Sequence, residues 1–211
     1  MFDNSNAVLL ADLYDMTKNP LCDMNSLSEK LESWLNSSVN RLYVNRPAPS
    51  AVIRSILRNK TSKSPFDFAY TEGENPLVSQ NAHVIASTTF VLVTESKISK
   101  KLLKESPAPY NYRSLFDGEK NVTDKIIIKF EDLAKNMVLS HPEYNQISFM
   151  CSAGNLRSVN RKYLMNLMNF WECNELEILV DNKTMIGKSH IGLMYFHHGN
   201  DRAVVAPLRE N

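Results

Sequence analysis

Residues 146–171 read QISFMCSAGNLRSVNRKYLMNLMNFW and contain three kinds of segment in succession. QISFM is a short apolar run that fits a buried strand. CSAGN brings small residues and a glycine, which are typical of a loop. RSVNRKYLMNLMNFW then repeats apolar residues at helical intervals. The stretch therefore predicts a strand, a loop and a helix, with the helix beginning near Arg157.

The sequence from residue 82 onward extends this alternation. We expect a buried strand or two in AHVIASTTFVLVT, a short basic helix in SKISKKLLKES, a strand in YNYRSLF and a helix in VTDKIIIKFEDLAKNMVL. Strands that alternate with helices predict an α/β fold with a mainly parallel central sheet flanked by helices. In such sheets ligands bind beyond the carboxyl ends of the strands, which is where CSAGNLR would lie.

The first part of the chain has a different residue pattern. Residues 26–44 and 50–60 carry apolar residues at helical spacing, and residues 60–80 contain the breakers Pro65, Gly73 and Pro76. We therefore expect a helical N-terminal extension and loop over 1–80, followed by an α/β domain over 81–211.

Composition excludes several classes of function. The 211 residues carry a formal net charge of +1, which gives no general reason to expect nucleic acid or an acidic membrane as partner. No apolar run approaches the roughly 18 residues that a membrane span needs. The N-terminus carries acids where a signal peptide would carry bases. Three scattered cysteines without a CxxC pair favour a reducing, cytoplasmic location and argue against a zinc site. We expect no metal and no cofactor.

The loop CSAGNLR has the chemistry of an anion site. A loop between a strand and a helix presents unpaired backbone N–H groups and the positive end of the helix dipole. Gly154 allows a positive φ angle, and Ser152 and Ala153 are small enough for an anion to approach the backbone. Arg157 can bind two phosphate oxygens at once. Under this field we expect the thiolate of Cys151 to be stabilised.

The pattern Cys-x-x-Gly-x-x-Arg-Ser, after an apolar strand and before a helix, resembles the signature loop of cysteine-based protein tyrosine phosphatases. CSAGNLRS is most similar to the version in the dual-specificity branch. The similarity covers roughly residues 82–196. Three positions depart from the family pattern: Met150 stands where a histidine is usual, and Asn155 and Leu156 are bulkier than the residues common there.

The resemblance implies an enzyme that hydrolyses phosphate monoesters through a phosphocysteine. Cys151 would be the nucleophile, and Ser158 would donate a hydrogen bond to its sulfur. An aspartate would be the general acid: Asp117, 34 residues before Cys151, is the preferred candidate and Asp124 the alternative. The substrate would be a phosphorylated protein or the 5′-phosphate of an RNA, with no membrane partner. The phosphate would be bound by Ser152, Ala153, Gly154, Asn155, Leu156 and Arg157.

Two other functions remain open. Arg157, Arg161 and Lys162 on an exposed helix face would suit the recognition helix of a helix-turn-helix or winged-helix DNA-binding protein. The strands LEILV, IGLMYFHH and RAVVAP would then form the wing. Alternatively, the chain keeps the phosphatase fold without its chemistry and recognises phosphorylated partners as a binding module.

Overall fold

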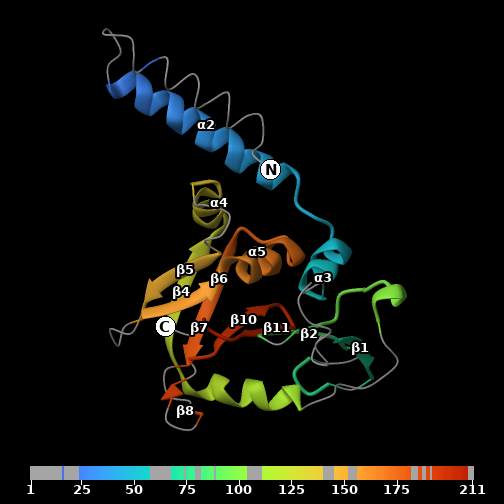
Figure 1. Cartoon of the computed structure of the whole chain (residues 1–211). Coiled ribbons are helices and arrows are strands. Elements are labelled where there is room, and N and C mark those ends of the chain that lie inside the picture. Colours follow the sequence, from blue (N-terminus) through green and yellow to red (C-terminus); the bar gives the residue numbers. More distant parts are fainter. Residues whose placement is uncertain are drawn as a thin grey trace. The chain divides into compact units, whose positions relative to one another are not determined.

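The computed structural model of this chain describes residues 16, 24–57, 68–73, 75–78, 82–87, 89–103, 111–139, 145–151, 156–181, 185–186, 189–190 and 192–208. The chain forms two compact units. The first contains helix α2 (Met24–Val44) and the C-terminal part of helix α4 (Phe130–Leu139). The second contains the β-sheet and the elements packed on it (Figure 1).

Helix α2 confirms the helix expected over residues 26–44. Of its 21 residues only Val39 is buried, and Leu31 is 44 % exposed. Helix α3 (Pro49–Leu57) confirms the second expected helix and begins at a proline. Proline suits a first helical position because its φ is already helical and it has no N–H that needs a partner there. α3 buries Val52, Ile53 and Ile56, and it belongs to the second unit.

The second unit is built on a seven-stranded sheet in the order β1-β2-β3-β11-β10-β7-β4. Its strands are β1 (Phe68–Glu72), β2 (Ala82–Ser87), β3 (Phe90–Thr94), β4 (Val122–Lys129), β7 (Glu175–Asp181), β10 (Met194–His198) and β11 (Asp201–Val205). Two further pairs stand apart from it: β5 (Gln146–Met150) with β6 (Leu156–Asn160), and β8 (Met185–Ile186) with β9 (Ser189–His190).

The prediction of a mainly parallel sheet is wrong. Every neighbouring pair in the seven-stranded sheet is antiparallel. The short connections explain this, because two residues can join only antiparallel neighbours whereas a parallel pair needs a crossover of a dozen residues or more. β2 leads into β3 through residues 88–89, and β10 leads into β11 through Gly199 and Asn200. Gly199 has a φ of +58°, which a glycine adopts without strain.

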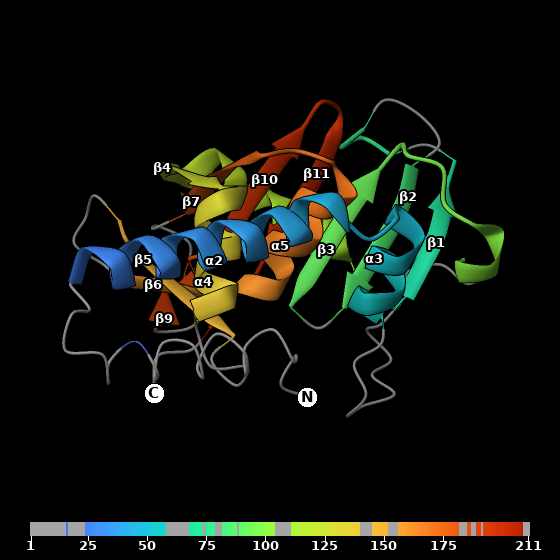
Figure 2. The same ribbon diagram turned by 90° about the horizontal axis from the view of Figure 1, so that it is seen from above.

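Side chains cover both faces of the sheet. α3 packs on β2 and α5 (Arg161–Phe170) packs on β7 and α3, so these helices share one face, as Figure 2 shows from above. The 3-10 helix η2 (Tyr112–Asn121) covers the other face and packs on β7. Its Tyr112 and Phe116 join an apolar core with Phe68, Val84, Val93, Tyr195 and Val204.

Several expected elements differ from those observed. YRSLF forms η2 and not a strand, and residues expected to be an unstructured loop include β1. VTDKIIIK forms β4, and only the following residues form α4. Three consecutive β-branched isoleucines favour the extended chain, which overrides a spacing that also matches a helix. In the basic segment 96–106, expected to form a helix, the described residues form only the short 3-10 helix η1 (Lys100–Leu102). The strands expected in AHVIASTTFVLVT are confirmed and are buried; QISFM also forms a strand, but the expectation that it is buried is wrong, because its residues are exposed or half-buried.

Candidate functional site

The expected phosphate loop connects two antiparallel strands. Cys151 follows β5 directly and is 3 % exposed, and Arg157 and Ser158 lie in β6. Phe149 pairs with Arg157 and Ser148 with Ser158. The expected phosphate-binding residues Ser152, Ala153, Gly154 and Asn155 lie outside the described residues. The segment is therefore a hairpin connection, and the helix expected to begin near Arg157 does not begin there.

Helix α5 begins at Arg161, four residues after Arg157. The side chain of Asn160 caps it by accepting a hydrogen bond from the backbone N–H of Lys162 at 3.0 Å. The field of a helix terminus decays within its first turn, so α5 gives Arg157 and Cys151 little of the polarisation that the sequence predicted. Met150 and Leu156 instead pair across the hairpin and are 63 % and 44 % exposed.

The other residues of the expected site are held by different partners. The Ser158 hydroxyl is buried, lies 2.7 Å from the hydroxyl of Ser148 and accepts from Gln146 Nε2 at 3.0 Å. The guanidinium stem of Arg157 runs against Gly192, where an added Cβ would stand 2.6 Å from Nε. The absence of a side chain at Gly192 thus leaves the space in which Arg157 lies.

The two candidate general acids lie on different elements. Asp117 is exposed on η2. Burial raises the pKa of Tyr195 in β10, and the charges of Asp181, Glu119 and Asp117 raise this pKa further. The charge of Asp117 thus acts on the face of the sheet that η2 covers. Asp124 is buried in β4 and does not lie in the first turn of a helix. The hydrogen bonds and ion pairs of the described residues do not join Asp117 to Cys151.

Of the three basic residues expected on an exposed helix face in the DNA-binding alternative, the structure places only Lys162 there. Arg161 is only 4 % exposed, and Arg157 is not on the helix. The strands expected to form a wing are β7, β10 and β11, which occupy the interior of the large sheet.

The C-terminal histidines have ordinary structural partners. The His197 imidazole contacts the carboxylate of Glu119 through Nε2, and His198 stacks on Trp171 with ring centroids 5.4 Å apart. Burial lowers the pKa of His197 more than Glu119 raises it. Among the residues that the structure describes, no three His, Cys, Asp or Glu side chains group in a way that would hold a metal ion. No described helix is long and apolar enough to span a bilayer.

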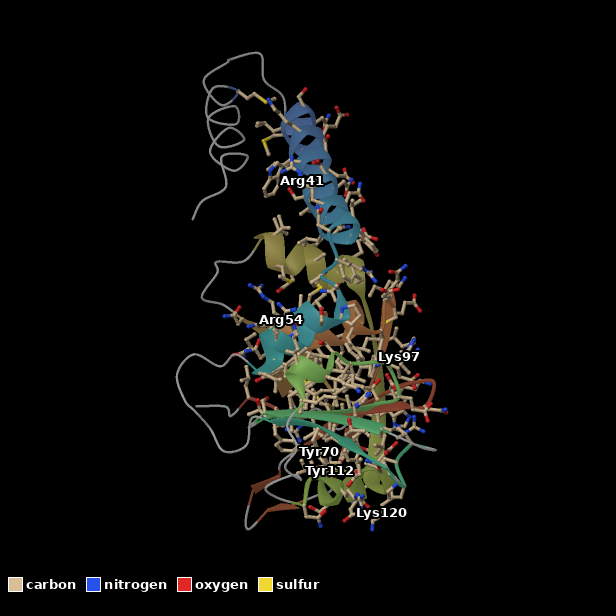
Figure 3. The ribbon with its side chains drawn as sticks, turned by 90° about the vertical axis from the view of Figure 1, so that its right-hand side faces the viewer. Arg41, Arg54, Tyr70, Lys97, Tyr112 and Lys120 are labelled. Atoms are coloured by element: carbon tan, nitrogen blue, oxygen red, sulfur yellow. The ribbon has the colours of Figure 1, made fainter. Side chains whose placement is uncertain are left out.

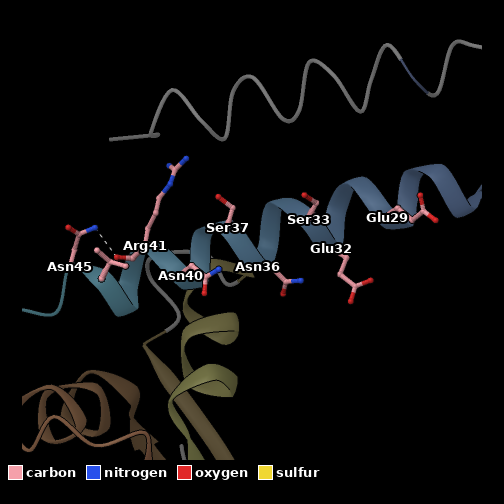
Figure 4. Close-up of a pocket in the computed structure, with 9 residues that line it drawn as sticks. Glu29, Glu32, Ser33, Asn36, Ser37, Asn40, Arg41 and Asn45 are labelled. Carbon is pink, nitrogen blue, oxygen red and sulfur yellow. Dashed lines mark hydrogen bonds between the residues drawn. The ribbon is translucent and has the colours of Figure 1, made fainter.

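A cavity of about 780 Å³ lies along α2 in the first unit (Figure 4). All its described lining residues belong to this helix or to Asn45, which follows it. Figure 4 shows that Glu29, Ser33, Ser37 and Arg41 follow one flank at helical spacing. The described part of the cavity is the polar side of a single helix, and its side chains do not converge on one point. It is therefore a weak candidate for a site.

A second cavity, of about 540 Å³, lies within the unit that contains the sheet. Three elements bring its main residues together: Glu95 follows β3, Trp171 and Glu172 follow α5, and Asn200 and Asp201 lie at the turn into β11. Its described lining residues are Pro49, Glu95, Ser96, Phe170, Trp171, Glu172, His198, Asn200 and Asp201. This lining combines aromatic rings with three carboxylates and contains neither lysine nor arginine.

Asp201 connects the three walls of this cavity. Its Oδ2 accepts hydrogen bonds from Thr94 Oγ1 at 2.6 Å and from Trp171 Nε1 at 2.8 Å. Its Oδ1 accepts from the backbone N–H of Glu95 at 3.0 Å. Asp201 is 7 % exposed and Trp171 is also 7 % exposed, so these bonds are shielded from water. They fix the indole ring on which His198 stacks.

Glu172 has an unusual backbone conformation at the rim of the cavity. Its φ of 52° makes it the only non-glycine residue with a positive φ in the described part of the chain. The position terminates α5, because the Cys173 N–H donates to the Met168 carbonyl as in a left-handed cap. Glycine is the usual residue there, and a side chain costs roughly 1 kcal/mol. Glu172, which lines the cavity, thus holds its position at some cost in stability.

The electrostatics of the cavity favour a cation. Glu95 and Glu172 are exposed at its rim, and Asn200 Nδ2 donates to Glu95 Oε2 at 3.1 Å. The carboxyl end of α5, which carries the negative end of the helix dipole, forms part of the same wall. The two carboxylates and the helix terminus therefore contribute charge of the same sign, whereas the Asn200 amide bonds to one oxygen of Glu95.

No known protein family matches this chain, and no curated protein is significantly similar to it.

Sequence reasoning missed this cavity because its residues are dispersed. Glu95, Trp171 and Asp201 are separated by 76 and 30 positions. Two local patterns were present in the sequence. One is an aromatic residue followed by an acid at the end of a helix, and the other is the turn HHGND; neither predicts a site by itself. The antiparallel pairing of β3 with β11 brings Glu95 and Asp201 together, and the packing of α5 in the same unit adds Trp171, whose indole N–H donates to Asp201.

Proposed function

We propose that this protein is a binding module that captures a cationic group in the cavity beside Trp171. One observation carries the proposal: Glu95 and Glu172 line a cavity that has a stacked Trp171–His198 pair in its wall and neither lysine nor arginine among its described lining residues. The exposed imidazole of His198 offers a flat ring against which a cationic group can pack, and the carboxylates supply the counter-charge. The same lining disfavours phosphate and other anions.

The test uses three blocked amino acids of similar size: N-acetyl N-methylamides of arginine, lysine and citrulline. Citrulline has nearly the shape of arginine without its charge. The Trp171 indole N–H is the reporter, and its NMR signal is separated from that of Trp34, the other tryptophan, by Trp34→Phe. We expect both cations to shift this signal, with Kd on the order of 1 mM. Equal binding of citrulline, or no binding of either cation, would contradict the proposal.

Glu172→Gly should stabilise the protein and weaken binding at the same time. Glycine relieves the positive φ, so we expect the free energy of unfolding to rise by about 0.5–1 kcal/mol. Loss of an exposed carboxylate should weaken binding of the cations about threefold to fivefold. Urea unfolding and NMR titration measure the two effects. The matched control is Glu175→Gln, an exposed acid in β7 outside the cavity, which should leave affinity unchanged.

Hydrolysis through a phosphocysteine stays a prediction. Its support is that Cys151 and Arg157 flank the same connection between β5 and β6. It predicts metal-independent hydrolysis of an aryl phosphate that is lost in Cys151→Ser and retained in Cys173→Ser, which removes the other described thiol. Absence of turnover by the wild type, together with absence of vanadate binding, would rule this mechanism out.

A further inference from the structure

We infer that the cationic group is a guanidinium, the side chain of an arginine in a partner polypeptide, and that the cavity prefers it to an ammonium group. This inference rests on the proposed function and makes it more specific. It depends on three properties of the cavity: a flat stacking surface, carboxylates approaching from two elements, and access to water.

The stacking surface is the ring of His198. It lies nearly parallel to the indole of Trp171, with an interplanar angle of 16°. Trp171 is buried while His198 is exposed, so the outer face of the imidazole is directed toward solvent and not toward the indole. A planar guanidinium stacks on such a ring, whereas an ammonium group has no flat face to offer.

The carboxylates favour the same group. Glu95 follows β3 and Glu172 follows α5, so the two acids reach the cavity from separate elements. A guanidinium has five donors in one plane and can bond to acceptors on two sides while it stacks. An ammonium group is a compact charge that can bond to both acids only if they lie close around one point.

Hydration also favours a guanidinium over an ammonium group. Glu95, Glu172, His198 and Asn200 are all exposed, so the cavity is open to water. The strongly hydrated ammonium of lysine gains little by leaving water for such a site, whereas a guanidinium is weakly hydrated and loses less. A volume of about 540 Å³ accommodates a side chain together with adjacent backbone, which favours an arginine within a polypeptide.

The experiment compares the arginine and lysine probes in the same titration of the Trp171 indole signal. We expect arginine to bind about tenfold more tightly than lysine in the wild type. His198→Ala should reduce this preference to less than threefold, chiefly by weakening arginine binding, and His198→Phe should restore it because the flat ring returns. His198 is exposed, so these variants are expected to fold.

The outcomes separate the two proposals. Equal affinities for arginine and lysine in the wild type would overturn the preference for guanidinium and leave cation binding intact. An arginine preference that persists undiminished in His198→Ala would overturn the role of stacking. If neither cation binds, or if citrulline binds equally well, both proposals fail together.

Discussion

Asp201→Ala is expected to lower the free energy of unfolding by about 3–5 kcal/mol. The substitution removes the acceptor for three donors, and two of these, the Thr94 hydroxyl and the Trp171 indole N–H, are buried. A buried donor without a partner costs about 1–3 kcal/mol, and bonds to a charged acceptor are stronger than neutral ones. The midpoint of thermal unfolding should fall by roughly 10 °C.

Urea unfolding followed by tryptophan fluorescence measures this effect. Asp117→Ala removes the same charge from an exposed position on η2 and should change stability by no more than about 0.5 kcal/mol. The loss of stability in Asp201→Asn should lie between those of the two alanine variants, because the amide oxygen can still accept a hydrogen bond while the NH₂ group faces other donors. A loss below 1 kcal/mol in Asp201→Ala would show that the network does not hold the cavity together.

Glu72→Ala is expected to cost about 2–4 kcal/mol. Glu72 lies at the end of β1, and its carboxylate accepts from Tyr112 Oη at 2.5 Å, from Asn75 Nδ2 at 2.6 Å and from Arg113 at 2.6 Å. Tyr112 and Asn75 are 2 % and 3 % exposed. Figure 3 shows Tyr112 next to Tyr70, which donates to the same carboxylate at 3.4 Å. These bonds attach η2 to the edge of the sheet.

Burial also keeps these tyrosines in the donor form. It is the largest cause of the raised pKa of both Tyr70 and Tyr112, and the Glu72 charge raises both further. The matched control is Arg113→Ala: its side chain is 42 % exposed, so loss of its ion pair should cost less than about 1 kcal/mol. A double-mutant cycle with Tyr112→Phe would isolate the coupling to Glu72. A cost of Glu72→Ala no larger than that of Arg113→Ala would contradict this account.

Sequence reasoning predicted elements whose signals were local and unambiguous. α2 and α3 have helical apolar spacing, and the β-branched residues around Val84 and Val91 indicate strands. It failed at Ile126–Ile128, where the spacing fits a helix and the residue type fits a strand, and at YRSLF, where aromatic residues pack from a 3-10 helix. The parallel sheet was inferred from these misassigned elements, so the error in topology followed from errors in local structure.

The candidate site illustrates a different limit. CSAGNLR has the residue types of an anion loop, but the physical argument needed a helix beginning at Arg157. Arg157 instead lies in β6, and the strand continues through Ser158 and Val159 before Asn160 caps α5. The same residue types have different chemistry in a hairpin connection. The Trp171 cavity had no comparable sequence pattern, because its chemistry arises from the pairing of distant strands.

The bonds of Asp201 have a consequence for folding kinetics. They join positions separated by 107 and 30 residues, to Thr94 and Trp171 respectively. Contacts of such long sequence separation form only after the intervening loops have closed, which is slow. During synthesis the cavity is therefore absent until β11 has emerged from the ribosome and paired with β3. A partner that requires this cavity would bind only chains in which β11 has already paired with β3.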